Sequence, residues 1–290
     1  MLILGIDFNN MVFGSFYGSP LQNSMGQNVN AIRGFFLKFQ TLFMNLKPDY
    51  VLFANDLSRA GTFRRKLFPD YKAQRKPTNE DIIFQMQKTE ILVRALGFKF
   101  LNNPLYEADD ILGMVSKWCL DNGHEMVIIS SDRDLYQLIN SNVQIYSFLK
   151  HEMINEEYLE EHYHLTPSQW IELKMIQGDP SDNIPGIKGV GKVTALKLMQ
   201  EFGSIENIYQ NLVNFSNGLR TKLINGKESL PLMRELVTIL TDYSKINFDI
   251  SLLFRCEPDE KILKESLCIL QLPSLIPVLN DLAKSYERSL

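Results

Sequence analysis

Nine carboxylates stand in five short clusters along the chain, and their placement is the most informative chemistry in the sequence. Most of them directly follow an apolar run or open a run with helical spacing. Carboxylates repeatedly placed where buried strands end converge on one crevice, where they repel one another unless a divalent metal ion is bound. The sequence therefore predicts a metal-dependent enzyme. The predicted metal ligands are Asp7, Asp56, Glu107, Asp109, Asp110, Asp132, Asp134, Asp179 and Asp182.

The ligand chemistry indicates which metal to expect. No Cys-x-x-Cys and no paired-histidine spacing suggests zinc, and all-oxygen ligation favours Mg²⁺, with Mn²⁺ as a substitute. Glu107 and Asp110 lie one helical turn apart on one face, with Asp109 on a neighbouring face. Acids in a first turn can instead merely complement the helix dipole, worth under about 1 kcal/mol each. Three strand-end aspartates in the same chain favour the metal site.

The elements that must position these acids can be predicted from apolar runs. Short continuous apolar runs are typical of parallel strands covered on both faces. Their alternation with helical segments predicts βαβ units, and hence an α/β fold with a central, mostly parallel sheet flanked by helices. Ligands bind outside the carboxyl ends of such strands. Strands are expected at 2–6, 50–54, 126–129 and 143–146, with helices at about 29–46, 79–96 and 108–122.

Composition bounds the class of protein. A chain of 290 residues with 45% hydrophobic content can bury one large core or two modest ones. No apolar run approaches the roughly 20 residues of a membrane span, and no basic leader precedes the first strand, so neither a membrane span nor a signal peptide is expected. Cys119, Cys256 and Cys268 lack ligand spacing and have apolar neighbours, which predicts core thiols in a reducing compartment.

A basic segment changes what the net charge of −4 implies about partners. Between residues 59 and 76 lie seven basic residues and one acid, together with Phe63, Phe68 and Tyr71. Cations suit phosphates, and aromatic faces can stack on unpaired bases, although each ring could equally be buried. Such a run is often only a solvated surface, but its place directly after the Asp56 strand favours nucleic acid. We expect DNA contacts from Arg64, Arg65 and Tyr71; the other basic residues are Arg59, Lys66, Lys72, Arg75 and Lys76.

A second signal is a pair of helices around a glycine-rich turn at 186–195. The first helix has a marked start, with Thr166 as N-cap, Pro167 as first helical residue and Gln169 as capping-box partner. It should end at Gly178, and a second helix should begin near Lys192. This is a helix-hairpin-helix pattern over about 166–202; the alternative is a connection that merely turns the chain.

The hairpin is predicted to bind phosphates. Gly189 and Gly191 leave backbone N–H groups uncovered at a helix N-terminus, which can grip a phosphate without reading the base. Lys188 and Lys192 add charge. The expected DNA contacts of this hairpin are Lys188, Gly189, Gly191, Lys192 and Thr194.

Three strings in order resemble the 5′-nuclease superfamily. They are Tyr106 to Asp110 (YEADD), Ser131 to Leu138 (SDRDLYQL) and Gly178 to Gly191 (GDPSDNIPGIKGVG). The superfamily includes flap endonucleases, the 5′→3′ exonuclease domain of bacterial DNA polymerase I, and freestanding bacteriophage 5′-nucleases. The resemblance spans Asp7 to about Asp242 and implies a PIN-like fold.

The resemblance implies roles for these residues. The acids nearest the catalytic metals would be Asp7, Asp56, Glu107, Asp109 and Asp132, and the other four would be outer acids. The basic segment, at about 57–80, would be the substrate gateway or arch. Lys72 and Arg75 match the catalytic basic pair that steadies the scissile phosphate. A K⁺ ion at the hairpin is a further expectation.

The activity implied is that of a structure-specific, Mg²⁺-dependent 5′→3′ exonuclease and flap endonuclease with a two-metal-ion mechanism. It would remove RNA primers or flaps during replication and repair. The expected organisation is a catalytic domain at 1–164 and a helical part at 165–290. The expected partners are DNA with 5′ flaps, nicks or RNA primers, and a single-strand-binding or other replication protein. The chain is expected to be a monomer in the cytoplasm of a bacterium or phage-infected bacterium.

Two other functions remain open from the residues. A catalytically silent junction-binding protein would not need this many repelling carboxylates, and a PIN-type ribonuclease would leave the hairpin unexplained. Two departures from the family pattern also stand out. Gly14 occupies a position where polymerase-type members commonly carry arginine, for which Arg33 is a candidate to compensate. The gateway from Gly61 to Asn79 is compact, which puts a fully threaded arch in doubt.

Overall fold

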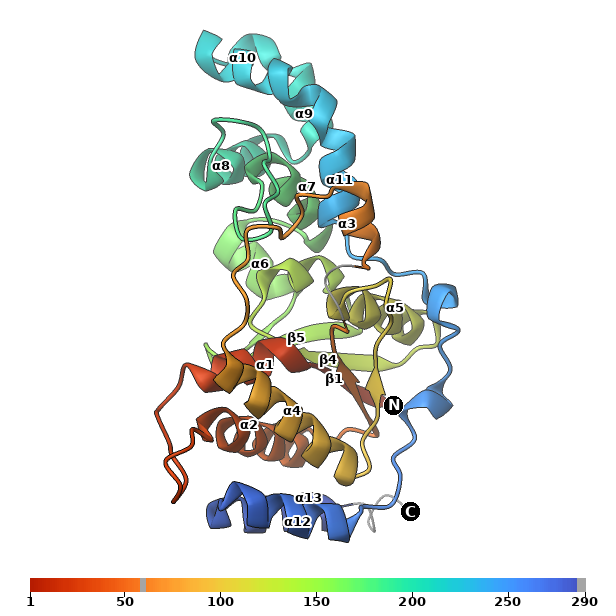
Figure 1. Ribbon diagram of the computed structural model, residues 1–290. Coiled ribbons are helices and arrows are strands. Elements are labelled where there is room, and N and C mark those ends of the chain that lie inside the picture. The colour runs from red at the N-terminus through yellow and green to blue at the C-terminus, as the bar shows by residue number, and fades with distance from the viewer. Residues whose placement is uncertain (58–60, 286–290) are drawn as a thin grey trace.

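A six-stranded β-sheet forms the centre of the computed structural model, which describes residues 1–57 and 61–285. The strands are β1 (Leu2–Asp7), β2 (Tyr50–Ala54), β3 (Phe100–Leu101), β4 (Glu125–Ile129), β5 (Val143–Ser147) and β6 (Glu152–Ile154). Their order is β3-β2-β1-β4-β5-β6, and all neighbours are parallel except β6, which runs antiparallel to β5 (Figure 1). The predicted α/β class with a mostly parallel sheet is confirmed.

Helices cover both faces of this sheet, and further helices extend away from it. They are α1 (Phe8–Phe16), α2 (Asn30–Leu46), α3 (Phe63–Leu67), α4 (Glu80–Ala95), α5 (Ala108–Asp121), α6 (Glu156–Tyr163), α7 (Pro167–Gln177), α8 (Lys192–Phe202), α9 (Ile205–Gln210), α10 (Asn217–Gly226), α11 (Leu230–Val237), α12 (Glu260–Leu270) and α13 (Ile276–Lys284). Short 3₁₀ turns are η1 (Arg133–Leu138), η2 (Leu212–Asn214), η3 (Lys227–Ser229), η4 (Tyr243–Ile246), η5 (Ile250–Leu253) and η6 (Pro273–Leu275).

The strands are continuously apolar because they feed two hydrophobic cores. Ile3 and Leu52 pack into one core with α5, α7 and α11. Leu4 and Val51, the neighbouring residues in each strand, pack into the other core with α1, α2 and α4. Alternate side chains of a strand point to opposite faces, so a strand buried on both faces has no polar face. This arrangement holds the carboxyl ends of β1, β2 and β4 in fixed register.

Most predicted element boundaries agree with the structure to within a residue or two. The N-terminus of α7 carries the predicted capping box, with the Thr166 N–H donating to the Gln169 side chain at 2.8 Å. Helix α11 ends at Val237 because Thr238 adopts an extended conformation. Strands β3 and β6 were not predicted, since two or three residues give no readable periodicity.

The prediction of three buried cysteines is wrong for two of them. Cys119 is buried in the core, whereas Cys256 and Cys268 are exposed. Cys268 lies on the exposed side of α12 together with Ile269, which is 57% exposed, so apolar neighbours in the sequence did not indicate burial here. All three cysteines are free thiols.

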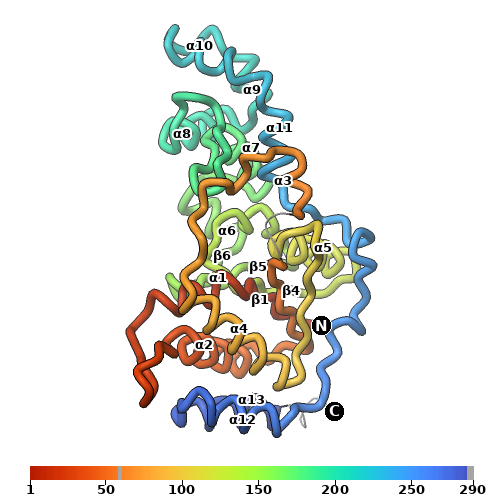
Figure 2. Tube along the Cα trace, in the orientation of Figure 1, coloured from red at the N-terminus to blue at the C-terminus, as the bar shows by residue number. Residues whose placement is uncertain are grey.

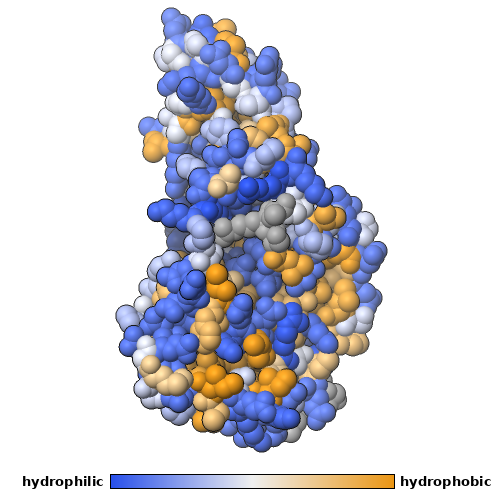
Figure 3. Space-filling view, in the orientation of Figure 1, coloured by the Kyte–Doolittle hydropathy of each residue, from blue (hydrophilic) through white to orange (hydrophobic). Residues whose placement is uncertain are grey.

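The chain has a body built on the sheet and an arm of helices that extends from it. Helices α7 to α11 form the arm, while α12 and α13 return to the body beside α2 and α4 (Figures 1 and 2). Hydrophilic side chains gather where the arm meets the body (Figure 3). No helix within residues 1–57 and 61–285 is long and apolar enough to cross a membrane. Arg59 of the predicted gateway and the end of the predicted helical part, 286–290, lie outside the described residues.

Candidate functional site

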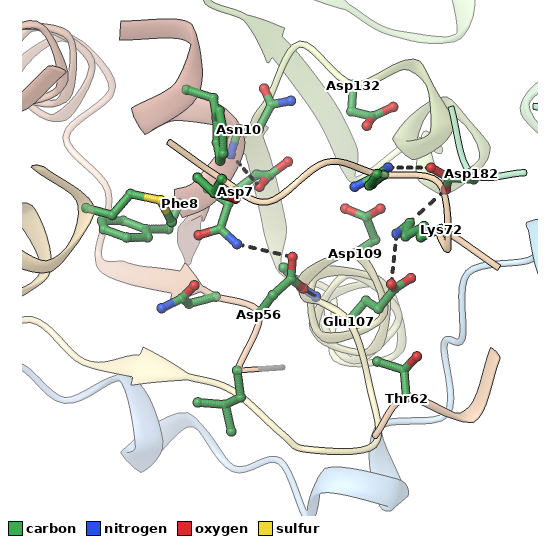
Figure 4. Close-up of a pocket in the computed structure, with 18 of the residues that line it drawn as sticks. Asp7, Phe8, Asn10, Asp56, Thr62, Lys72, Glu107, Asp109, Asp132 and Asp182 are labelled. Atoms are coloured by element: carbon green, nitrogen blue, oxygen red, sulfur yellow. Dashed lines mark hydrogen bonds and ion pairs between the residues drawn. The ribbon is translucent and has the colours of Figure 1, made fainter. Parts of the chain in front are cut away.

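A cleft of about 890 Å³ opens at the carboxyl ends of β1 and β2, where the arm meets the body. Residues from the strand ends, the start of α5, η1 and the loop after α7 line it. Figure 4 shows Asp7, Asp56, Asp109 and Asp132 around one space, with Lys72 at its edge beside Glu107 and Asp182. Eight of the nine predicted acids line this cleft: Asp7, Asp56, Glu107, Asp109, Asp132, Asp134, Asp179 and Asp182.

Hydrogen bonds orient the strand-end acids. Asp7, the last residue of β1, accepts from the Asn10 N–H at 3.2 Å and from the Ser130 hydroxyl at 2.8 Å. Asp56, two residues beyond β2, accepts from the Ala108 N–H at the start of α5, at 2.7 Å. These bonds tie Asp7 to α1 and to the end of β4, and Asp56 to the first turn of α5, so the fold brings the two carboxylates to the same end of the cleft.

Burial and mutual repulsion disfavour the ionised form of Asp7 and Asp109, two of the acids at the inner end of the cleft. Burial raises the pKa of Asp7 to about 7; the hydrogen bond from Ser130 offsets part of this shift, and the charge of Asp132 adds to it. Burial also raises the pKa of Asp109 well above its usual range, with Asp7 and Asp132 contributing. In the described part of the chain, no hydrogen bond or ion pair holds the Asp109 carboxylate. The inner site therefore lacks positive charge, which is what a metal ion would supply.

Glu107 and the outer acids are instead neutralised by basic side chains. Lys72 Nζ lies 2.8 Å from Glu107 Oε1 and 3.6 Å from Asp182 Oδ2, and Arg75 also pairs with Asp182. Lys174 Nζ lies 2.6 Å from Asp134 Oδ1 and pairs with Asp179. Burial alone would lower the pKa of Lys72 and of Lys174, but the neighbouring carboxylates outweigh it and raise both.

The all-oxygen donor set fits a divalent cation at the inner end of the cleft. Asp7, Asp56, Asp109 and Asp132 would hold it, because their carboxylates face the same space in Figure 4. Among the described residues, no three His, Cys, Asp or Glu side chains already stand as a complete ligand set. Metal binding therefore requires rotation of some of these side chains, including release of Glu107 from Lys72.

Asp110 is a correction to the predicted ligand set. It is fully buried and does not line the cleft. Its two oxygens accept hydrogen bonds from the Arg64 guanidinium at 2.6 and 2.8 Å, from the Glu107 N–H at 3.1 Å and from the Leu240 N–H at 3.0 Å. As the capping-box partner of Glu107 it turns back over the helix start. Its lone pairs are occupied, so the metal-ligand prediction for Asp110 is wrong.

Two predicted DNA contacts are also corrected. Arg64 is 3% exposed. Besides Asp110, its guanidinium donates hydrogen bonds to the Leu236 and Thr238 carbonyls and to Glu107. Tyr71 is equally buried, and its hydroxyl donates to Glu107 at 2.8 Å, so it presents no face to a base. Both side chains hold the gateway onto the cleft from inside. Arg65 is partly exposed, and its DNA contact stays a prediction.

The hairpin between α7 and α8 has an apolar inside and a basic outside. Ile187 and Val190 are buried, whereas Lys188, Gly189, Gly191 and Lys192 are exposed and Thr194 is partly so. Within the described chain, neither the Gly189 N–H nor the Gly191 N–H donates a hydrogen bond to another backbone group. Gly189 has φ 83°, a left-handed conformation that favours glycine. The turn thus presents unused donors between two lysines.

Sequence reasoning missed several residues that shape these sites. Lys174 was not predicted. It lies four residues after Trp170 and so on the same face of α7 as that apolar residue, and this spacing could have indicated that it points inward. Lys222 of α10 donates to the Gly189 carbonyl at 3.0 Å and supports the hairpin. At Gly14 a Cβ atom would lie 2.4 Å from the Phe148 ring, so no side chain fits there. Lys38 lies beside it, donating to the Ser15 hydroxyl at 3.0 Å, and compensation by Arg33 stays a prediction.

Comparison with known families gives two adjoining matches. The model of the 5′-3′ exonuclease N-terminal resolvase-like domain matches residues 2–164, and that of the 5′-3′ exonuclease C-terminal SAM fold matches residues 165–261. The thermostable DNA polymerase I of Thermus thermophilus is 37% identical over 281 residues, which is 94% of this chain and 32% of the polymerase. The chain thus spans about a third of the length of that relative.

Solved structures from bacteriophage T5 have a similar fold. The T5 5′-exonuclease with bound zinc matches over 100% of both chains, with a TM-score of 0.69 and 20% identity. The T5 flap endonuclease in a pseudo-enzyme–product complex with DNA and metal ions covers 93% of this chain and 100% of its own, with a TM-score of 0.66 and 22% identity. These matches confirm the predicted fold, including its helical part.

Proposed function

The chain belongs to the 5′-3′ exonuclease family, and from this premise we propose that it is a metal-dependent 5′→3′ exonuclease and flap endonuclease. One observation carries the proposal: eight carboxylates line a single cleft together with Lys72 and Arg75 of the basic segment. The substrate would be DNA bearing a 5′ flap, nick or RNA primer, and the product a strand cut near its 5′ end or junction.

The metal would be Mg²⁺, with Mn²⁺ as a substitute, held by Asp7, Asp56, Asp109 and Asp132 with Glu107 joining them. Asp134, Asp179 and Asp182 would act as outer acids. Both T5 structures hold bound metal ions, which supports a divalent cofactor here. When bound, such ions supply Lewis-acid chemistry for phosphodiester hydrolysis. The carboxylates fix where that chemistry occurs, and burial of Asp7 and Asp109 strengthens their attraction for a cation.

Lys72 and Arg75 would hold the scissile phosphate. Both extend from the gateway into the cleft, where their charges already face carboxylates. A phosphate entering this space could take over the same donors, and the developing negative charge of the reaction would be stabilised by them. Arg75, whose side chain is 37% exposed, would meet the strand before Lys72, whose side chain is 13% exposed.

The hairpin would grip the duplex at a distance from the cut. Lys188 and Lys192 supply charge, and the N–H groups of Gly189 and Gly191 supply donors for backbone phosphates, so recognition would not depend on base sequence. A K⁺ ion at this hairpin is part of the same proposal. Because duplex grip and metal cleft are separate, a strand reaches the cleft only at a free end or junction. Structure is thus selected rather than sequence.

The proposal also covers the domain boundary, the oligomeric state, the cellular role and the partner. We place a domain boundary at 164/165, which is where the two family-model matches meet. The chain would act as a monomer in the cytoplasm of a bacterium or an infected bacterial cell, in primer or flap removal during replication and repair. A single-strand-binding or other replication protein would be its partner.

Cleavage of a 5′-labelled single-flap duplex tests this function. The expected result is a cut at the junction with Mg²⁺ and no cut in EDTA. Loss of cutting when the flap is blocked at its 5′ end would show that the free end must thread through the gateway. A blocked flap that is cut equally would show that the free end need not thread through the gateway. Tight flap binding without cleavage in either Mg²⁺ or Mn²⁺ would instead identify a junction-binding protein.

A further inference from the structure

The loop from Gly178 to Gly186, which joins α7 to the hairpin, is closed on itself. The Asp179 N–H donates to the Ile184 carbonyl at 2.8 Å, and the Ile184 N–H donates to the Asp179 carbonyl at 2.8 Å. Gly178 and Gly186 have φ of 71° and 60°, and a Cβ on Gly186 would lie 2.3 Å from Gly178 N. The backbones of these two glycines are in direct contact, and a side chain on either would not fit between them. The loop is therefore a rigid extension of the hairpin.

The gateway segment from Asp70 to Arg75 is fastened along this loop. In each of the four hydrogen bonds the acceptor is a main-chain carbonyl, either of the loop or of the gateway segment. Each bond therefore holds the backbone of one of the two in place. The bonds are Lys72 N–H to the Asp182 carbonyl at 2.8 Å, Asn183 Nδ2 to the Asp70 carbonyl at 2.8 Å, Gln74 Nε2 to the Pro180 carbonyl at 2.7 Å and Arg75 Nε to the Ser181 carbonyl at 3.2 Å.

Lys72 sits in a strained backbone conformation at this contact. Its φ is 54°, in the left-handed region, which is strained for a residue other than glycine. Such strain persists only where surrounding contacts hold it. The Asp182 carbonyl holds the Lys72 N–H from one side, and Asn183 holds the chain two residues earlier, at Asp70. Asn183 is itself left-handed, with φ 60°, which asparagine tolerates better than most residues.

We propose that Asn183 is a positioning residue for Lys72. Its amide clamps the Asp70 carbonyl and so keeps the following turn in the conformation that directs the Lys72 ammonium into the cleft. This inference rests on the proposed function, because the position of Lys72 matters to the reaction only if a phosphodiester is cut. The placement of Lys72 is then set by the same rigid loop that begins the duplex-binding hairpin.

A double-mutant cycle tests the proposal. Asn183→Gly removes the amide but keeps a residue that readily adopts the left-handed conformation. Asn247→Gly is the matched control, because Asn247 is also left-handed, with φ 46°, and is exposed at the end of η4. Single-turnover cleavage of a flap duplex with Mg²⁺ is measured for both, for Lys72→Ala, and for Asn183→Gly/Lys72→Ala.

The expected result is strong coupling between the two residues. Asn183→Gly should slow cleavage by about tenfold in the wild-type background but by less than about twofold in the Lys72→Ala background, since neighbouring residues that act together are not additive. Duplex affinity in EDTA and the melting temperature should match those of Asn247→Gly. Gln74→Ala, which frees the Pro180 carbonyl, should repeat the pattern if Asn183→Gly fails to fold.

Three outcomes would overturn the inference. Equal losses in both backgrounds would mean that Asn183 acts independently of Lys72. No loss in the wild-type background would mean that the Asp70 contact does not position Lys72. A fall in melting temperature that accounts for the slower cleavage would make Asn183 merely structural. A wild-type chain that binds flaps without cutting them would overturn the proposed function and this inference together, whereas the first three outcomes leave the function standing.

Discussion

Arg64 and Asp110 form a bidentate ion pair inside the protein, with N–O distances of 2.6 and 2.8 Å and with neither side chain more than 3% exposed. The pair joins three separate segments. Arg64 belongs to gateway helix α3, Asp110 to the first turn of α5, and both bind main-chain groups of residues 236–240. The base of the gateway, the cleft and the end of the helical arm are therefore fastened at one point.

Removing one member of this pair should destabilise the protein strongly. Arg64→Met or Asp110→Asn leaves a buried partner unpaired, and breaking a buried pair in this way typically costs about 3–5 kcal/mol of unfolding free energy. The double change Arg64→Met/Asp110→Leu should recover part of that loss. Urea unfolding measures the effect, with Arg65→Met as the matched control, since Arg65 is partly exposed on the same helix. If Asp110→Asn left stability unchanged but weakened metal binding, Asp110 would be a ligand after all.

Mutual repulsion within the inner site should be measurable without metal. In EDTA, Asp109→Asn/Asp132→Asn should melt at a higher temperature than the wild type, because it removes two of the repelling charges. Millimolar Mg²⁺ should raise the melting temperature of the wild type through preferential binding to the folded state. It should have little effect on the double variant. A double variant that melts no higher than wild type in EDTA would show that no repulsion is stored in the cleft.

The same site should give the metal-free protein an inverted pH dependence. The pKa of Asp7 is raised to about 7 and that of Asp134 to about 6, chiefly by burial, so the folded state binds protons more tightly than the unfolded state. For acids whose folded pKa is raised, stability falls as pH increases from the unfolded value near 4 toward the folded value. In EDTA the unfolding free energy should therefore drop between pH 5 and pH 7.5. Saturating Mg²⁺ should flatten this slope; a rise in stability over that range without metal would contradict the account.

Charge removal at the hairpin should weaken binding uniformly. Lys188→Ala/Lys192→Ala should lower affinity for all duplex sequences alike, and each lost phosphate contact should reduce the salt slope by roughly 0.9. Fluorescence anisotropy over a range of salt concentrations measures both. Lys261→Ala/Lys264→Ala on α12 is the control with the same change in net charge, remote from the cleft. Losses that depend on base sequence would contradict recognition through the backbone.

The positions of the inner acids could be predicted because they depend on the ends of strands. A continuous apolar run such as that before Asp7 predicts a strand buried on both faces of the sheet. Parallel strands then bring their carboxyl ends to the same edge. The capping box at Thr166 was equally readable, because it depends on residues three apart. In both cases the signal is local, and the fold only has to bring the pieces together.

The details that could not be predicted depend on contacts distant in sequence. Glu107 and Asp110 share a motif, yet one faces the cleft and the other binds Arg64, 46 residues earlier. Nothing in a basic run distinguishes Arg64, which is buried, from Arg65, which is partly exposed. The pairing of Lys174 with Asp134 likewise joins α7 to η1 across the cleft wall. The pattern of charged residues in the sequence predicts the kind of site. Contacts between distant segments decide which of those charged residues line the site and which are buried in ion pairs.

We propose that the inner carboxylates make the cleft a metal-dependent phosphodiesterase. The most direct test compares single-turnover cutting of a 5′-labelled flap duplex by wild type and by Asp109→Asn/Asp132→Asn across a Mg²⁺ titration. Wild type should cut at the junction with a rate that saturates in Mg²⁺. The double variant should bind the flap equally well but cut it slower by on the order of 10³-fold or more. Equal cutting by the two proteins would contradict the account, because the chemistry would then lie outside this cleft.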